Sequence, residues 1–93
     1  MITAIVLVHT DVHRIPEVAG RIAELPGVSE VYSVTGDVDL VAIVRVTEHE
    51  QLADVIADQI SKVDGVTSTQ TYLAFRTYSK HDLEAAFSLG MDG

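Results

Sequence analysis

Residues 26–46 read PGVSEVYSVTGDVDLVAIVRV, and the fold follows from this stretch and its surroundings. The run from Val28 to Thr35 is rich in β-branched residues, which favours a strand. Gly36-Asp37 then supplies the residue types of a tight turn, and Val38 to Val46 is the most apolar run of the chain. Two strand-like runs joined so closely predict an antiparallel hairpin.

A strand and a helix precede this hairpin, and a helix and a strand follow it. Ile2 to Val8 is predicted as the first strand, which ends at His9-Thr10-Asp11, and Val66 to Tyr78 is predicted as the last. Apolar residues recur at helical spacing from Arg14 to Leu25 and again from Thr47 to Val63. The buried stripes of these helices are expected at Ile15, Val18, Ala19, Ile22 and Leu25, and at Leu52, Val55, Ile56, Ile60 and Val63.

The resulting order is βαββαβ, and it contains an internal repeat. The first helix is followed by Pro26-Gly27-Val28 and a strand. The same order recurs 38 positions later, where the second helix is followed by Asp64-Gly65-Val66 and a strand. Two βαβ halves of this size predict an α+β fold, the ferredoxin-like sandwich with four antiparallel strands and both helices on one face. We expect residues 1–80 to form this domain and residues 81–93 to form a short C-terminal helix or tail.

Composition and charge exclude several classes of function. The 93 residues allow one domain, and 47% hydrophobic residues are typical of a globular chain. The formal net charge of −8 opposes direct binding to nucleic acid and to anionic membranes. The absence of cysteine excludes a disulfide scaffold and a thiolate metal site. With no leader or membrane span recognised at the N-terminus, a cytoplasmic protein is expected.

The first strand is apolar on both of its faces. Ala4, Val6 and Val8 alternate with Ile5 and Leu7, although a strand with one wet face should alternate apolar and polar residues. The strand after the turn behaves in the same way. We therefore expect a second copy to bury the free face of the sheet, giving a face-to-face homodimer. The alternative is that these residues are scattered apolar surface positions.

Asp39 interrupts an otherwise apolar strand directly after the turn at Gly36-Asp37. A carboxylate there suits a bound ammonium group, while backbone N–H groups of the turn suit a carboxylate, and these are the two ends of an amino acid. The alternatives are a solvated carboxylate and ordinary turn chemistry. The hydroxyl run from Thr67 to Thr71 either serves a polar ligand or reflects β propensity alone.

Other combinations of reactive residues are weaker. His9 and His13, with Asp11 between them, either bind a metal or are solvated histidines in a strand-to-helix loop. Paired carboxylates at Asp37 and Asp39 are the one acid–base arrangement that the spacing allows. The chain has no phosphate loop, no dinucleotide-binding glycine motif and no recognisable triad. The sequence therefore predicts no catalytic residue, no metal and no cofactor.

The segments VYSVTGDVDL at 31–40 and GVTSTQT at 65–71 together resemble the effector-binding domain of the Lrp/AsnC regulators, also called the regulation of amino-acid metabolism (RAM) domain. The resemblance runs from the first strand to about Lys80. It implies a domain that dimerises through its sheets and often assembles into rings of four or five dimers, an octamer or a decamer. Effectors of that family, usually amino acids, bind at interfaces between dimers.

The resemblance also implies which residues bind the ligand. It places ligand contacts at Gly36 and Asp39 of the turn and at Thr69 and Thr71 of the last strand. We include the neighbours Thr35 and Asp37 in this candidate site.

One departure from the family concerns the N-terminus. Full-length members carry a helix-turn-helix domain before this module, whereas here Met1 leads directly into the first strand. We expect a stand-alone, non-enzymatic amino-acid sensor that reaches DNA only through a full-length Lrp/AsnC partner. The alternatives are a small dimeric α+β barrel enzyme, of the cofactorless monooxygenase or isomerase type, and a purely structural partner of a full-length regulator.

Overall fold

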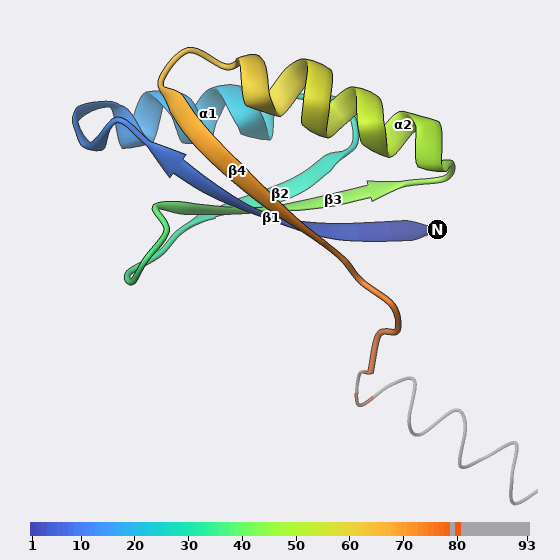
Figure 1. The fold of residues 1–93 in the computed structure, drawn as a ribbon. Helices are drawn as coiled ribbons and strands as arrows, with labels where there is room; N and C mark the ends of the chain where they lie inside the picture. Colours follow the sequence, from blue (N-terminus) through green and yellow to red (C-terminus); the bar gives the residue numbers. More distant parts are fainter. Residues whose placement is uncertain (79, 81–93) are drawn as a thin grey trace, which may run out of the picture.

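The four strands form one antiparallel sheet, with the helices on a single face (Figure 1). The computed structural model describes residues 1–78 and 80. The strands β1 (Ile2–Thr10), β2 (Val28–Ser33), β3 (Leu40–Val46) and β4 (Val66–Leu73) lie in the order β2-β3-β1-β4. This arrangement confirms the predicted ferredoxin-like βαββαβ fold. The predicted C-terminal helix or tail at 81–93 lies outside the described residues.

The first helix begins as a short turn of 3₁₀ helix and continues as a regular α-helix. Asp11 caps η1 (Val12–Arg14), where its side chain accepts a hydrogen bond from the His13 amide. Helix α1 (Ile15–Ala23) carries Pro16 in its first turn, where no backbone N–H is needed. It packs mainly against β2.

The second helix is irregular, although the sequence predicted one continuous helix there. It starts as α2 (His49–Ala53) with a capping box between Glu48 and Gln51. It widens into the π-helical segment η2 (Asp54–Gln59) and tightens into the 3₁₀ turn η3 (Ile60–Lys62). No helix among the described residues has the length and apolar character needed to cross a membrane.

Three strand ends differ from the predicted ones. β1 continues to Thr10, so His9 is a strand residue and the prediction of a loop histidine was wrong. β4 ends at Leu73 because its partner, β1, begins at Ile2. The backbone hydrogen bond from Ala74 N to Thr3 O already lies close to the start of β1. Residues 34–39 connect β2 and β3, where the sequence predicted a two-residue turn. The connection is longer because Asp39, at its end, donates a backbone hydrogen bond to Val8 of β1.

The core lies between the helices and the inner face of the two central strands. Alternate residues of β1 and β3 point into it and are buried. The helices contribute Val18, Ile22, Val55 and Ile60. The strand positions are Ala4, Val6, Val8, Leu40, Ala42, Val44 and Val46.

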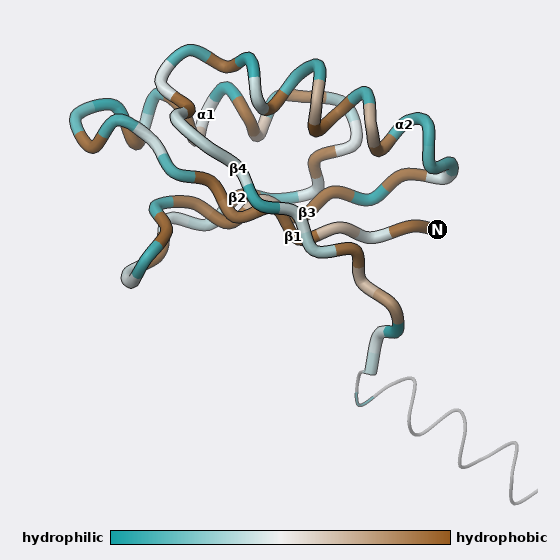
Figure 2. Tube along the Cα trace, viewed as in Figure 1, coloured by the Kyte–Doolittle hydropathy of each residue, from teal (hydrophilic) through white to brown (hydrophobic). Residues whose placement is uncertain are grey.

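No element of the described chain covers the opposite face of the sheet (Figure 1). Hydrophobic residues run along both central strands (Figure 2). Ile5 is 36% exposed, and Leu7, Val41 and Ile43 are half-buried beside it. This face, which we call the open face, confirms the predicted apolar character of both strand faces. At one edge of the open face, the Tyr32 hydroxyl donates a hydrogen bond to Glu30 Oε2 at 2.6 Å. This hydrogen bond is the main cause of the raised pKa of Tyr32.

Two glycines provide a test of the packing between the helix layer and β4. Gly65 has a φ of +102°, and a Cβ added there would lie 2.6 Å from Val18 Cγ2. Gly65→Ala should therefore lower the free energy of unfolding by about 1–3 kcal/mol in urea denaturation. Gly20, in the exposed part of α1, has nothing within 4 Å of an added Cβ. Gly20→Ala should raise stability by about 1 kcal/mol, and equal effects of the two substitutions would contradict this packing.

Candidate functional site

Asp39 and the turn residues singled out by the sequence lie where β1 ends and β3 begins. Asp39 is hydrogen-bonded there through three groups. Its N–H donates to Val8 O at 3.0 Å and its carbonyl accepts from Val34 N at 3.1 Å. Its Oδ2 accepts from the part-buried Thr10 N–H at 2.8 Å. Asp39 therefore closes the loop 34–39 against β1, a structural role that the sequence did not reveal.

His9 joins the same loop to β4. Its Nε2 lies 2.8 Å from Asp37 O, and its Nδ1 lies 3.1 Å from Ser68 Oγ. Because a carbonyl oxygen can only accept, Nε2 carries a proton, and in the neutral ring Nδ1 accepts from the Ser68 hydroxyl. The half-buried imidazole is thus a brace between the loop and the open-face side of β4. Residue spacing offered no signal for it, because the contact joins segments 28 and 59 positions apart.

The two candidate threonines point to the other face of the sheet. Thr69 and Thr71 pair with Val8 and Val6, so they lie on the face that carries the helices. Thr69 Oγ1 is 3.5 Å from Ser61 Oγ of η3, and Thr71 is exposed on the edge strand. Of the hydroxyl run, the residue that touches the loop assembly is Ser68.

The loop candidates are close together and accessible. Thr35, Gly36 and Asp37 are exposed and Asp39 is half-buried. Gly36 has a φ of +117°, a conformation that favours glycine. Thr69 lies at the same end of the sheet, since Val8 is bonded to Asp39 and paired with Thr69. A ligand role for these residues stays a prediction.

The histidine–aspartate spacing noted in the sequence does not build a metal centre in the part of the chain that the structure covers. His9 is held in the brace, and His13 is exposed in η1. Among residues 1–78 and 80, no group of three or more His, Asp or Glu side chains is placed to hold a metal ion.

The sheet topology, with helices on one face and a polar loop at the end of its central strands, defines a ferredoxin-like α+β domain. The profile of the Lrp/AsnC ligand binding domain matches residues 3–83, and the chain belongs to this family. The HTH-type transcriptional regulator LysM of Saccharolobus solfataricus is 40% identical over 63 residues, which are 68% of this chain and 44% of that protein. The chain spans about half the length or less of the curated relatives it matches.

Solved structures show the same fold. The crystal structure of TTHA0845 from Thermus thermophilus is 50% identical with a TM-score of 0.80, covering 86% of this chain and all of that one. A feast or famine regulatory protein of M. tuberculosis, solved in complex with L-methionine, is 26% identical with a TM-score of 0.70. That match covers 86% of this chain and 54% of the M. tuberculosis chain.

Substitutions at Asp39 distinguish the hydrogen bond that its side chain accepts from the effect of its charge. Asp39→Ala leaves the part-buried Thr10 N–H without its acceptor and should cost about 1–3 kcal/mol in urea denaturation. Asp39→Asn keeps an acceptor oxygen and should cost less than half as much. Asp37→Ala is the matched control, because Asp37 is exposed and enters the brace through its backbone carbonyl. A destabilisation by Asp37→Ala equal to that of Asp39→Ala would refute this role of the Asp39 carboxylate.

Proposed function

We propose that this chain is a cytoplasmic, non-enzymatic and oligomeric module that binds an amino acid and acts as a metabolite sensor or transcriptional co-regulator through full-length partners. The observation that carries the proposal is the loop 34–39 of an Lrp/AsnC ligand binding domain, with Asp39 held at its base. The L-methionine bound to the M. tuberculosis relative supports an amino acid as the ligand class.

The proposed binding mode uses both ends of the amino acid. Asp39 Oδ2 is engaged by Thr10 N–H, so we assign the ligand ammonium to the other oxygen, Oδ1. The exposed backbone of Thr35, Gly36 and Asp37 would receive the carboxylate through its N–H groups. The Thr69 and Thr71 hydroxyls lie on the helix-bearing face of the sheet, and we assign them to a ligand shared between copies.

A second copy of the chain is the proposed cover of the open face. Leaving Ile5, Leu7, Val41 and Ile43 against water is costly for a domain of this size, and two facing sheets remove that surface together. The loop 34–39 lies at the end of the sheet and stays accessible in such a dimer. A ring of dimers would then bring loops of neighbouring dimers together, and ligand binding would favour that assembly state.

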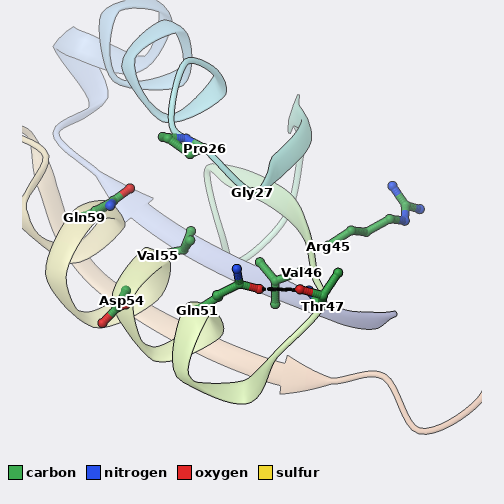
Figure 3. Close-up of a pocket in the computed structure, with 9 residues that line it drawn as sticks. All are labelled: Pro26, Gly27, Arg45, Val46, Thr47, Gln51, Asp54, Val55 and Gln59. Carbon is green, nitrogen blue, oxygen red and sulfur yellow. Dashed lines mark hydrogen bonds between the residues drawn. The ribbon is translucent and has the colours of Figure 1, made fainter.

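Two observations bear on the alternatives. The enzyme alternative requires an apolar internal cavity with a His or Tyr pointing into it. The cavity at the end of β3, beside the second helix, is lined by neither residue type (Figure 3). The relative LysM is named as an HTH-type transcriptional regulator, which supports a regulatory role.

Thermal unfolding in the presence of each of the twenty amino acids tests the ligand class. A ligand at 100 times its dissociation constant adds about 2.7 kcal/mol, which raises the Tm by several degrees in a domain of this size. Asp39→Asn should abolish the shift because it removes the charge that holds the ammonium group. Asp58→Asn, the same change on the exposed side of the second helix, should leave it intact. No shift with any of the twenty would contradict amino-acid binding and favour the purely structural partner.

Light scattering after size-exclusion chromatography tests the open face. Leu7→Lys places a charge in the centre of this face, and the molar mass should fall to that of one chain while circular dichroism keeps the folded spectrum. Glu17→Lys on exposed α1 is the control and should retain the assembled mass. A wild-type protein that elutes as a monomer would refute the dimer.

A further inference from the structure

The segment that follows β4 is exposed and carries aromatic side chains. Residues 74–78, which we call the arm, read AFRTY. Among the described residues, the last backbone hydrogen bond that ties the arm to the sheet runs from Ala74 N to Thr3 O at 2.8 Å. Beyond this bond the arm runs away from the sheet and from the helix layer (Figure 1). Phe75 is 95% exposed and Tyr78 is 73% exposed.

The arm continues an apolar surface that begins on the sheet. Tyr72 pairs with Ile5, so its side chain lies on the open face, and it is half exposed. An aromatic side chain buries roughly 150–250 Å² when it packs into a core or an interface. A contiguous exposed apolar surface of this kind is typical of an interaction site. The arm therefore indicates a contact with another protein surface.

The cavity at the end of β3 is a surface of matching character. Its volume is about 380 Å³, which is within the range of cavities that hold small organic groups, and an aromatic ring is such a group. Pro26, Val46 and Val55 are its apolar lining residues (Figure 3). Gly27 leaves space beside the two valines, because a Cβ added there would lie 3.1 Å from Val46 Cγ1 and from Val55 Cγ2.

The strand register puts the arm and the cavity at the same end of the sheet. Leu73, the last residue of β4, pairs with Ala4 of β1. Ala4 pairs with Val44 of β3, which in turn pairs with Val28 of β2. The arm therefore begins at the level where β2 starts, and the cavity residue Gly27 lies directly beyond that level. Because β4 and β2 are opposite edges of the sheet, the arm and the cavity are on opposite sides of one copy.

A second copy on the open face can bring the arm to the cavity. Facing sheets keep their strand directions within about 30° of each other, and a closed pair of copies has a two-fold axis. When this axis runs along the strands, β4 of one copy lies over β2 of the other, and both strands keep their level along the sheet. The arm of each copy then leaves the pair beside the cavity of the other copy. An axis across the strands would instead bring the arm to the opposite end, near the loop 34–39.

Charge also favours a contact between copies through the arm. The whole chain carries a net charge of −8. The arm contains Arg76 and no acidic residue, and Lys80 follows it. Both of these cationic residues are exposed. A basic segment is attracted to the acidic surface of a second copy.

We propose that the arm of each copy docks on a second copy, with the Phe75 ring in the cavity beside Gly27, Val46 and Val55. The inference rests on the face-to-face dimer of the proposed function and adds a specific contact to it. Docking removes the Phe75 side chain from water and fills the cavity in the same step. Since each copy has one arm and one cavity, a two-fold pair contains two such contacts.

Intermolecular NMR broadening tests the contact. The chain contains no cysteine, so a nitroxide spin label attached to Thr77→Cys reports on the arm alone. This variant, without isotope label, is unfolded in urea together with ²H,¹⁵N-labelled wild-type protein, and the mixture is refolded so that assemblies contain both chains. The spin label should broaden the wild-type amide signals of residues 27, 45–47 and 51–55, which surround the cavity. A label on Glu17→Cys, in exposed α1, is the control and should not broaden them.

The pattern of broadening distinguishes the outcomes. Broadening confined to residues 34–39 and 64–69 would indicate the other two-fold arrangement and overturn the proposal. The absence of broadening would also overturn it when light scattering shows a molar mass of two or more chains. A molar mass of one chain would refute the dimer of the proposed function as well, so the two failures are distinguishable.

Substitution of Phe75 identifies the docking group. Phe75→Ser should move the methyl signals of Val46 and Val55 in the assembled protein, because it removes the ring current. It should also weaken self-association by about tenfold or more, while circular dichroism keeps the folded spectrum. Tyr78→Ser, at the other exposed aromatic residue of the arm, is the matched control and should leave these methyl signals in place. Unchanged methyl signals of Val46 and Val55 in Phe75→Ser would refute the docking of this ring.

Discussion

The fold depends on the central strand β1, which is hydrogen-bonded on both edges and apolar on both faces. β3 and β4 satisfy its backbone groups, and the helices bury Ala4, Val6 and Val8 on one side. Its other side chains lie on the open face, so the same strand that organises the core also contributes to the apolar surface that the described chain leaves uncovered. Its last two residues, His9 and Thr10, then hold the loop 34–39. Core, proposed assembly and proposed effector site are thus all connected through one strand.

The parts of the fold that could be predicted from the sequence are those determined by local patterns. Continuous apolar runs marked β1 and β3, helical spacing marked the stripe with Val18 and Ile22, and the repeated glycine turns at Gly27 and Gly65 marked the two halves. Strand ends were less accurate because they depend on partners. β4 stops close to the first residues of its partner β1, and β1 continues to Thr10 because Thr10 pairs with Val66 of β4.

The sequence identified candidate site residues but not how they are arranged. The VTGDVD turn pointed to Asp39, and the structure places it at the base of an exposed loop. The sequence could not reveal that one carboxylate oxygen is already bonded, or that His9 and Ser68 brace the loop. It also assigned Thr69 and Thr71 to the same ligand, whereas strand alternation directs them to the helix-bearing face. Contacts between distant segments determine these features, and no local pattern encodes them.

The two polar regions lie at opposite ends of β3 and have different physical characters. The loop 34–39 is exposed, whereas the cavity beside η2 is lined by residues from separate segments of one chain. Under the proposed function, a ligand at the loop acts on assembly. The net charge of −8 on the chain opposes binding to a phosphate backbone at either region.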